Sequence, residues 1–199
     1  MDTIKSKYHE TLAATVIKNL EKRQMEGYYC PTVEDAEKLA FSFLKDGQTV
    51  SFGGSMTLEE TGMLTALRHD PSIHLIDRST AKTPDETKKM YHDALSSDVY
   101  FMSTNAITTG GELVNIDGTG NRVAALIYGP ETVVILAGMN KIAANVDEAL
   151  SRVHNVATAQ NCIRLDKKTP CAITGACADC LSPDLSLIHI SEPTRRSYI

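Results

Sequence analysis

The chain has 199 residues, 42% of them hydrophobic and 23% charged, which is the composition of one globular domain long enough to bury a core. Its formal net charge of −5 argues against general nucleic-acid binding, because that function requires a basic face. No apolar run approaches the roughly 20 residues that cross a bilayer, and the charged N-terminus lacks a signal-peptide core. We therefore expect a cytoplasmic protein with no membrane span.

Helical and strand patterns alternate along the chain. Apolar residues at helical spacing mark the first segment, and Thr83, Pro84 and Glu86 form a strong helix start further on. In chain order we expect helix 3–25, strand 28–29, helix 32–45, strand 49–54, helix 58–68, strand 73–77, a helix from 83, strand 99–104, strands 112–117 and 122–128, strand 132–138, and a long helix from 145. This alternation predicts an α/β fold, a three-layer sandwich with a mostly parallel sheet.

Two features of the sequence give more specific structural predictions. The stretch over 132–138 is almost entirely apolar, which is typical of a strand buried on both faces. The glycine-rich sequence DGTGN over 117–121 separates 112–117 from 122–128 and predicts a β-hairpin formed by those two segments.

A glycine turn joins the strand expected over 49–54 to the following helix. Its candidate ligand-binding residues are Gly53, Gly54, Ser55 and Thr57. Backbone amides at such a turn favour an anion, glycines allow a ligand to approach the main chain, and hydroxyls add donors. The alternative is a tight turn in which Thr57 only caps the helix. Glu59 and Glu60 are candidate acids or bases, although first-turn glutamates also serve simply as favourable charges.

Two further polar segments supply candidate ligand-binding residues. The first segment follows the buried strand 99–104, so we expect its side chains at the same sheet edge as the glycine turn. The candidates are Ser103, Thr104, Asn105 and Thr108 from the first segment, and Asn115, Asp117, Asn121 and Arg122 from the second. Amides, hydroxyls and one arginine suit a small anion, because arginine binds a carboxylate through paired hydrogen bonds. The alternative is that the second segment only forms a stable turn. Lys141 is either another anion contact or a solvated lysine.

Four of the five cysteines lie close together in sequence. Cys177 and Cys180 have the two-residue gap that lets two thiolates face one metal, and Cys171 lies nearby. In a reducing compartment such a group favours metal binding over disulfides, with an iron–sulfur cluster ahead of zinc. Cys162 is a possible fourth ligand or a buried apolar residue. We place His154, in a predicted helix, at the surface.

Two common catalytic signatures are absent from the sequence. It contains no G-x-S-x-G motif, and its six histidines are scattered, so we expect no hydrolytic triad. The full G-x-G-x-x-G fingerprint is also missing, which argues against a nicotinamide enzyme.

The final residues differ in character from the rest of the chain. From Leu185 to Arg195 the sequence resembles a translated adapter used in preparing sequencing libraries. We therefore expect 185–199 to be a non-native tail, the alternative being a divergent polar tail. The cysteine-rich segment 166–184 is then incomplete.

Three segments together resemble the LUD-domain family, which includes the small subunit of the bacterial lactate-oxidation complex. They are SFGGSMTLEETGM from Ser51, STNAITTGGELVNIDGTGNRVAALIYGPETVVILAGMNK from Ser103, and TPCAITGACADCLSPD from Thr169. The resemblance implies a LUD domain over 1–165, with a fold like that of ribose-5-phosphate isomerases and coenzyme A transferases. It also implies an arginine and a further cysteine after Asp184, which this chain lacks, so one expected metal ligand is missing.

The resemblance implies a subunit of an iron–sulfur electron-transfer system for lactate oxidation. Such a subunit binds a small anionic metabolite, lactate or a phosphorylated or acyl compound, and meets iron–sulfur partner subunits. One alternative is a stand-alone enzyme acting on phosphorylated or acyl metabolites. The other is a structural partner protein that its cysteines stabilise through zinc.

Overall fold

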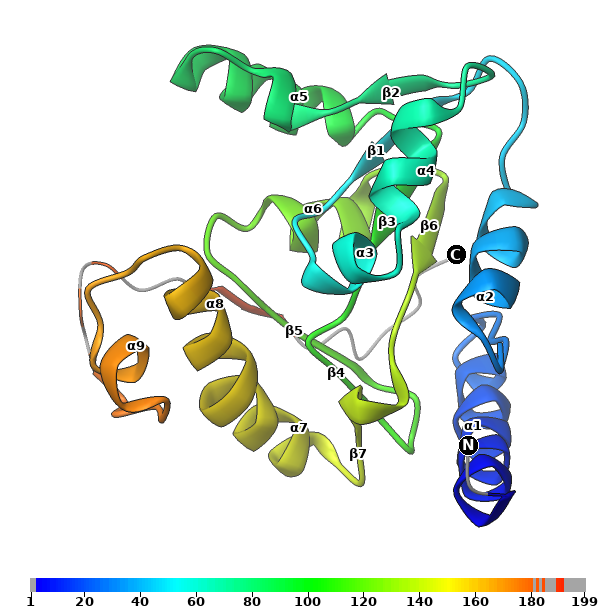
Figure 1. The fold of residues 1–199 in the computed structure, drawn as a ribbon, viewed down its shortest axis with the longest axis vertical. Coiled ribbons are helices and arrows are strands. Elements are labelled where there is room, and N and C mark those ends of the chain that lie inside the picture. The colour runs from blue at the N-terminus through cyan, green and yellow to red at the C-terminus, as the bar shows by residue number, and fades with distance from the viewer. Residues whose placement is uncertain (1–2, 181, 183, 185–188, 192–199) are drawn as a thin grey trace.

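The computed structural model describes residues 3–180, 182, 184 and 189–191 (Figure 1). Its helices are α1 (Thr3–Lys22), α2 (Val33–Phe41), α3 (Met56–Glu60), α4 (Met63–His69), α5 (Pro84–Ala94), α6 (Asn121–Tyr128), α7 (Val146–Arg152), α8 (Ala159–Arg164) and α9 (Pro170–Thr174). Its strands are β1 (Thr49–Phe52), β2 (His74–Ile76), β3 (Val99–Met102), β4 (Ala106–Thr108), β5 (Leu113–Asp117), β6 (Thr132–Ile135), β7 (Ile142–Ala143) and β8 (His189–Ser191). None of the helices in the described ranges is long and apolar enough to cross a membrane.

A parallel sheet of four strands forms the centre of the molecule, in the order β2-β1-β3-β6. Val50 of β1 pairs with Val99 of β3, and Val99 pairs in turn with Thr132 of β6. Because all four strands run in one direction, their carboxyl ends lie along one edge of the sheet. Any residue that directly follows a strand is therefore brought to that edge.

Helices cover both faces of this sheet, so the predicted three-layer α/β sandwich is confirmed. Side chains alternate between the faces along a strand. Val99 and Phe101 of β3 pack into a buried cluster with α2, α3 and α4, whereas Tyr100 and Met102 pack against α5 and α6 on the other face. In Figure 1, α3 and α4 lie in front of the strands.

A second, smaller sheet has the order β7-β4-β5-β8. The β4–β5 and β5–β8 pairs are antiparallel, and β4 pairs with β7 in parallel. Ala106 and Val114 of this sheet pack against Ala149 and Val153 of the helical segment that begins with α7. That segment continues through a π-helical turn, Val153–Thr158, into α8. β8 lies inside the predicted non-native tail, most of which falls outside the described residues.

The predicted hairpin of 112–117 and 122–128 is wrong. β5 pairs with β4, which precedes it in sequence, and the second segment forms helix α6. Val123, Ala125 and Leu126 are buried, while Ile127 and Tyr128 at the end of the helix are exposed. This is burial with a helical period, and a short apolar run cannot be assigned to helix or strand from its composition.

Other predicted boundaries also differ from the structure. Residues 28–29 form no strand, and the helix expected to reach Lys45 ends at Phe41. The helix expected over 58–68 is two short helices, because Gly62 adopts a left-handed conformation with φ of 75° between them. The strand expected over 132–138 to be buried on both faces is β6, which ends at Ile135. It lies at the end of the strand order, and three of its four residues are only partly buried.

Helix α1 docks against the turn between β4 and β5. Asn19 Nδ2 donates to the Thr109 carbonyl at 2.8 Å, and Arg23 Nε donates to the Gly110 carbonyl at 2.9 Å. The Arg23 guanidinium also pairs with the carboxylate of Glu112. Gly111 has φ of +83°, and a Cβ there would lie 3.0 Å from the Asn19 carbonyl carbon. The turn therefore needs glycine to let α1 approach.

Candidate anion-binding site

The carboxyl ends of β1, β2 and β3 bring three segments of the chain together. Gly53 and Gly54 follow β1, Arg78 lies two residues after β2, and Ser103 directly follows β3. The predicted convergence of the glycine turn with the segment after β3 is therefore confirmed. We call this region the carboxyl-edge site.

Both glycines of the turn allow another side chain to approach the main chain. A Cβ on Gly53 would lie 3.1 Å from Arg122 Cδ and 3.1 Å from the Tyr100 hydroxyl. A Cβ on Gly54 would overlap Arg78 Nη2. The Gly53 amide donates to the Phe101 carbonyl at 2.8 Å, so that amide has a protein partner. The absence of side chains at Gly53 and Gly54 therefore lets Arg122 and Arg78 lie against the main chain of the turn.

Arg122 is the centre of a buried polar network. Its Nη1 donates to the Ser103 carbonyl at 2.9 Å and to Asn115 Oδ1 at 2.7 Å. Its Nη2 donates to Asn105 Oδ1 at 2.8 Å and to the Ile116 carbonyl at 3.1 Å. All four terminal N–H groups thus have protein acceptors. In this arrangement Arg122 ties the segment after β3 to β5.

Asp117 completes the network from the end of β5. Its Oδ2 accepts from the amides of Arg122 and Val123 at 2.9 and 3.1 Å, which satisfies amides in the first turn of α6. Its Oδ1 lies 3.6 Å from Arg122 Nε. Asn115 is fully buried, and its Nδ2 has no hydrogen-bond partner among the described residues. One buried donor of the network is therefore unpaired in the described part of the chain.

Lys141 approaches the same network from the turn after β6. Its Nζ donates to Ser103 Oγ at 2.7 Å and to the Thr104 carbonyl at 3.1 Å. An ammonium group has three protons, so these two contacts leave one for another acceptor. Burial, together with the charges of Arg152 and Arg122, lowers the pKa of Lys141 to about 8, while Glu60 acts in the opposite direction.

Donors without protein partners surround this network. The Arg78 guanidinium stacks over the Tyr91 ring at 5.7 Å and forms no hydrogen bond within the described ranges. Burial raises the pKa of the neighbouring Tyr100 hydroxyl, which stays a neutral donor. Arg152 donates to the carbonyls of Asn140 and Asn105 through Nε and Nη1, and its Nη2 has no partner in the described chain.

Positive charge therefore exceeds negative charge at the carboxyl-edge site. Arg122 has Asp117 beside it. Arg78, Lys141 and Arg152 have no carboxylate oxygen within ion-pairing distance among the residues described. The excess is local, because the whole chain carries a net charge of −5.

The remaining predicted residues of the glycine turn lie on or beside α3. Ser55 caps this helix by accepting from the Leu58 amide at 3.4 Å. The Thr57 hydroxyl has no hydrogen-bond partner in the described chain. Of the two glutamates, Glu60 acts electrostatically on Lys141, and Glu59 acts on Arg68. Glu60 is therefore the one associated with the carboxyl-edge site.

The structure brings together most of the residues predicted from sequence. Gly53, Asn105 and Arg122 meet directly, and Thr104 joins them through its carbonyl contact with Lys141. Thr108 does not join them, because its hydroxyl donates a hydrogen bond to the Glu112 carboxylate at the turn where α1 docks. Asn121 begins α6 and forms no side-chain hydrogen bond within the described residues.

Arg78 and Arg152 were not predicted from the sequence. Arg78 had a usable signal, because it follows the strand expected over 73–77, and residues at that position reach the carboxyl edge of a parallel sheet. Arg152 lies at the end of α7, and its contact with Asn105 joins residues 47 positions apart. No local pattern in the sequence predicts such a contact.

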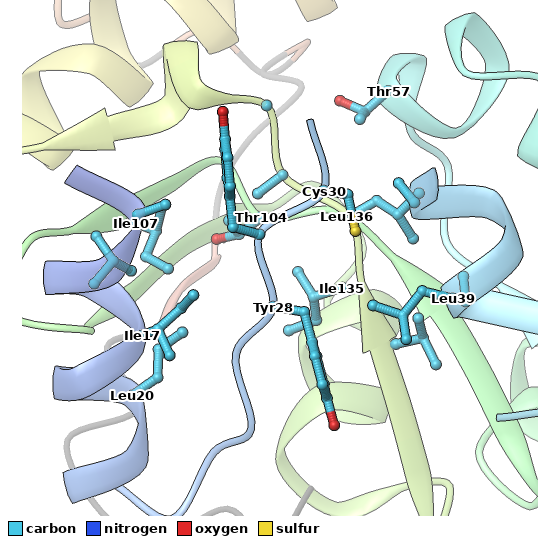
Figure 2. Close-up of a pocket in the computed structure, with 18 of the residues that line it drawn as sticks. Ile17, Leu20, Tyr28, Cys30, Leu39, Thr57, Thr104, Ile107, Ile135 and Leu136 are labelled. Carbon is cyan, nitrogen blue, oxygen red and sulfur yellow. The ribbon is translucent and has the colours of Figure 1, made fainter. Parts of the chain in front are cut away.

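An apolar cavity of about 610 Å3 lies beside this site. It opens between α1, the segment over 25–33, α2 and the end of β6. In Figure 2, Ile17 and Leu20 of α1 lie on one side of the cavity and Leu39 of α2 on the other. Thr57 and Thr104 also line it.

The predicted metal-binding cysteines lie around α8 and α9. Cys162 and Cys171 are buried in one small cluster, and burial raises the pKa of the Cys171 thiol. Cys177 Sγ lies 3.8 Å from Nδ1 of His154, which was expected at the surface and is partly buried. Among the residues described, no three His, Cys, Asp or Glu side chains form a group that could hold a metal ion.

Comparisons with known proteins give one extensive match. The LUD domain matches residues 13–196, which is most of the chain. No curated protein matches.

Two solved structures are distantly similar to this chain. The tetrameric eIF2B-beta2-delta2 complex from C. thermophilum is 18% identical, with a TM-score of 0.38, over 62% of this chain and 44% of that one. The structure of eIF2B delta from Chaetomium thermophilum is 20% identical, with a TM-score of 0.37, over 70% of this chain and 51% of that one. This chain thus spans about half the length of those proteins. Likenesses at these TM-scores carry no argument about its function.

Proposed function

The chain belongs to the LUD-domain family, and we propose that it is a lactate-utilisation subunit whose carboxyl-edge site binds a small anionic metabolite. The observation that carries the proposal is the group of unpaired donors around Arg122. Arg78, Lys141 and Arg152 each have donor capacity beyond the protein contacts described above. Charge-assisted hydrogen bonds from such groups are the strong contacts to a carboxylate or phosphate.

The network of Arg122 supports this role by holding the site in place. Arg122 fixes Asn105 and Ser103, and Ser103 in turn accepts a hydrogen bond from Lys141. Preorganised donors bind an anion better than mobile ones, because less side-chain freedom is lost on binding. Arg122 is thus a positioning residue, and Arg78 and Lys141 are the proposed ligand contacts.

Isothermal titration calorimetry with L-lactate, and separately with inorganic phosphate, tests this proposal. We expect Arg78→Gln and Lys141→Gln each to weaken binding about tenfold or more, which corresponds to losing one charge-assisted hydrogen bond. Lys82→Gln is the matched control, because it removes an exposed cation close to Arg78 in sequence. Equal affinities in all three variants would contradict the proposal.

A second function, a stand-alone enzyme for acyl or phosphorylated metabolites, is favoured by one observation. Lys141 Nζ lies 2.7 Å from Ser103 Oγ, and an amine with a pKa of about 8 can accept or donate a proton near neutral pH. The charge of Glu60 also acts on Lys141. Turnover of an acyl thioester or sugar phosphate that is lost in Lys141→Met and kept in Lys82→Met would establish this function. Binding without turnover across such a panel would exclude it.

The proposed cofactor is an iron–sulfur cluster held by Cys171, Cys177 and Cys180, with Cys162 as a possible fourth ligand and zinc as the alternative metal. Such a site would connect the chain to iron–sulfur partner subunits. Metal analysis of protein purified without oxygen tests it, with a Cys177→Ser, Cys180→Ser variant as control. Equal metal content in both proteins, or none in either, would remove the cofactor from the proposal.

A further inference from the structure

The apolar cavity beside the carboxyl-edge site has the size of a small-molecule site. Its volume of about 610 Å3 lies within the range of roughly 300–1,000 Å3 that is typical of ligand pockets. Helices α1 and α2 form two walls, and the end of β6 lies between them. Most of the lining is aliphatic or aromatic: Val16, Ile17, Leu20, Leu39, Phe43 and Ile135.

The cavity reaches the carboxyl-edge site through Thr104, a neighbour of Lys141. Thr104 lines the cavity, and its carbonyl oxygen accepts a hydrogen bond from Lys141 Nζ at 3.1 Å. Met139 and Ile142, on either side of Lys141 in sequence, also line the cavity. Lys141 does not itself line the cavity, and Thr104 links its ammonium to the apolar space.

Two threonines also line the cavity on the side of α3. Thr57 and Thr61 line the cavity, and Glu60 between them in sequence acts electrostatically on Lys141. The Thr57 hydroxyl, which has no partner in the described chain, is available to an acceptor group. Figure 2 shows Thr57 near the top of the view and Tyr28 near the bottom, with Cys30 and Leu136 between them.

A ligand that uses both regions must carry a negative charge at one end and a hydrocarbon chain at the other. Lactate can occupy the polar site, but it is too small to fill the apolar space. A neutral apolar molecule would leave the ammonium of Lys141 without an anion. We propose that the ligand is a medium-chain carboxylate of about six to ten carbons, with its carboxylate at Lys141 and its chain between α1 and α2. This inference rests on the proposed function, because it uses the same cations.

The test is calorimetric titration with acetate, butanoate, hexanoate and octanoate. Each methylene that enters the cavity leaves water, and we expect affinity to rise by up to about fourfold per methylene. Octanoate should then bind at least about 30-fold tighter than acetate. This series uses the unmodified protein, so it does not depend on whether a variant folds.

Two phenylalanine substitutions test where the hydrocarbon chain of the ligand lies. Ala36 of α2 lines the cavity, and Ala36→Phe should weaken octanoate binding at least about tenfold while acetate binding stays the same. Ala14 of α1 is exposed and does not line the cavity, so Ala14→Phe should change neither affinity. Lys141→Met should weaken both ligands by a similar factor.

The possible outcomes separate the inference from the proposed function. Acetate binding that depends on Lys141, with octanoate no tighter, would overturn the inference and leave the anion site standing. Tight octanoate binding that Lys141→Met does not change would overturn the inference, because the carboxylate would then lie elsewhere. Acetate binding that Lys141→Met does not change would overturn the proposed function. A rise in affinity with chain length that Ala36→Phe abolishes, and Ala14→Phe does not, supports the inference.

Discussion

Arg122 is a buried cation and Lys141 a partly buried cation of one site, but their surroundings give them different roles. Arg122 directs its terminal N–H groups to four oxygens of the protein. Among the described residues, Lys141 has two acceptors for its three protons. The first residue therefore holds the site together, whereas the second is available to a ligand. Substitution of each should give a different kind of defect.

Substitution of Arg122 should chiefly reduce stability. Lysine cannot supply the forked donors of a guanidinium, so Arg122→Lys leaves the Asn105 and Asn115 side chains incompletely bonded. We expect a loss of about 3 kcal/mol in the free energy of unfolding, measured by urea denaturation. Arg164→Lys, at an exposed position, should stay within about 0.5 kcal/mol of the unmodified protein. Similar losses in both variants would show that Arg122 is not the centre of the network.

The ionisation of Lys141 should make ligand binding depend on pH. Its pKa in the folded protein is lowered to about 8, so anion affinity should fall as the pH rises past 8. The stability of the fold changes in the opposite direction and increases as the pH rises. Between pH 8 and the ordinary value of 10.5, folded Lys141 has lost its proton while the unfolded chain retains it, so stability rises through this window.

Comparison with Lys141→Met isolates both effects, because every other titrating group is common to the two proteins. Relative to that variant, the unmodified protein should gain stability between pH 8 and 10.5 and lose ligand affinity over the same interval. Parallel pH profiles for the two proteins would show that Lys141 titrates at its ordinary pKa.

At the scale of elements, sequence patterns predicted the central sheet better than the connections around it. β1, β2, β3 and β6 were expected from short apolar runs, and all four lie where predicted. α6 was mistaken for a strand because eight mostly apolar residues suit either structure. The deciding fact is the pairing of β5 with β4, a contact between elements that local pattern does not contain.

The docking of α1 against the β4–β5 turn gives a prediction for a pair of glycines. Gly47 and Gly111 both have positive φ, at +79° and +83°, but only Gly111 has backbone atoms near the position of an added Cβ. Gly47→Ala should cost about 1 kcal/mol for the backbone conformation alone. Gly111→Ala should cost about 2–3 kcal/mol, because it also displaces Asn19 of α1. Equal losses of unfolding free energy would mean that α1 does not pack tightly at this turn.

For the whole molecule, the parallel sheet explains how much of the site could be predicted from sequence. Segments that follow parallel strands meet at one edge, so the convergence of Gly53 with Asn105 could be predicted once the strands were identified. Arg78 obeys the same rule and could have been included. The contact of Arg152 and the cavity between α1 and α2 depend on how helices pack against the sheets, and no short motif encodes that packing.

The central claim is that an anion binds beside Lys141, and the pKa of that lysine measures this directly. It can be followed through the chemical shift of the Lys141 Cε carbon by NMR, with Lys141→Met to assign the signal. Without ligand, the pKa should be near 8. With saturating octanoate, a neighbouring carboxylate favours the charged amine, so the pKa should rise toward 10.5. An unchanged pKa at saturation would contradict the claim.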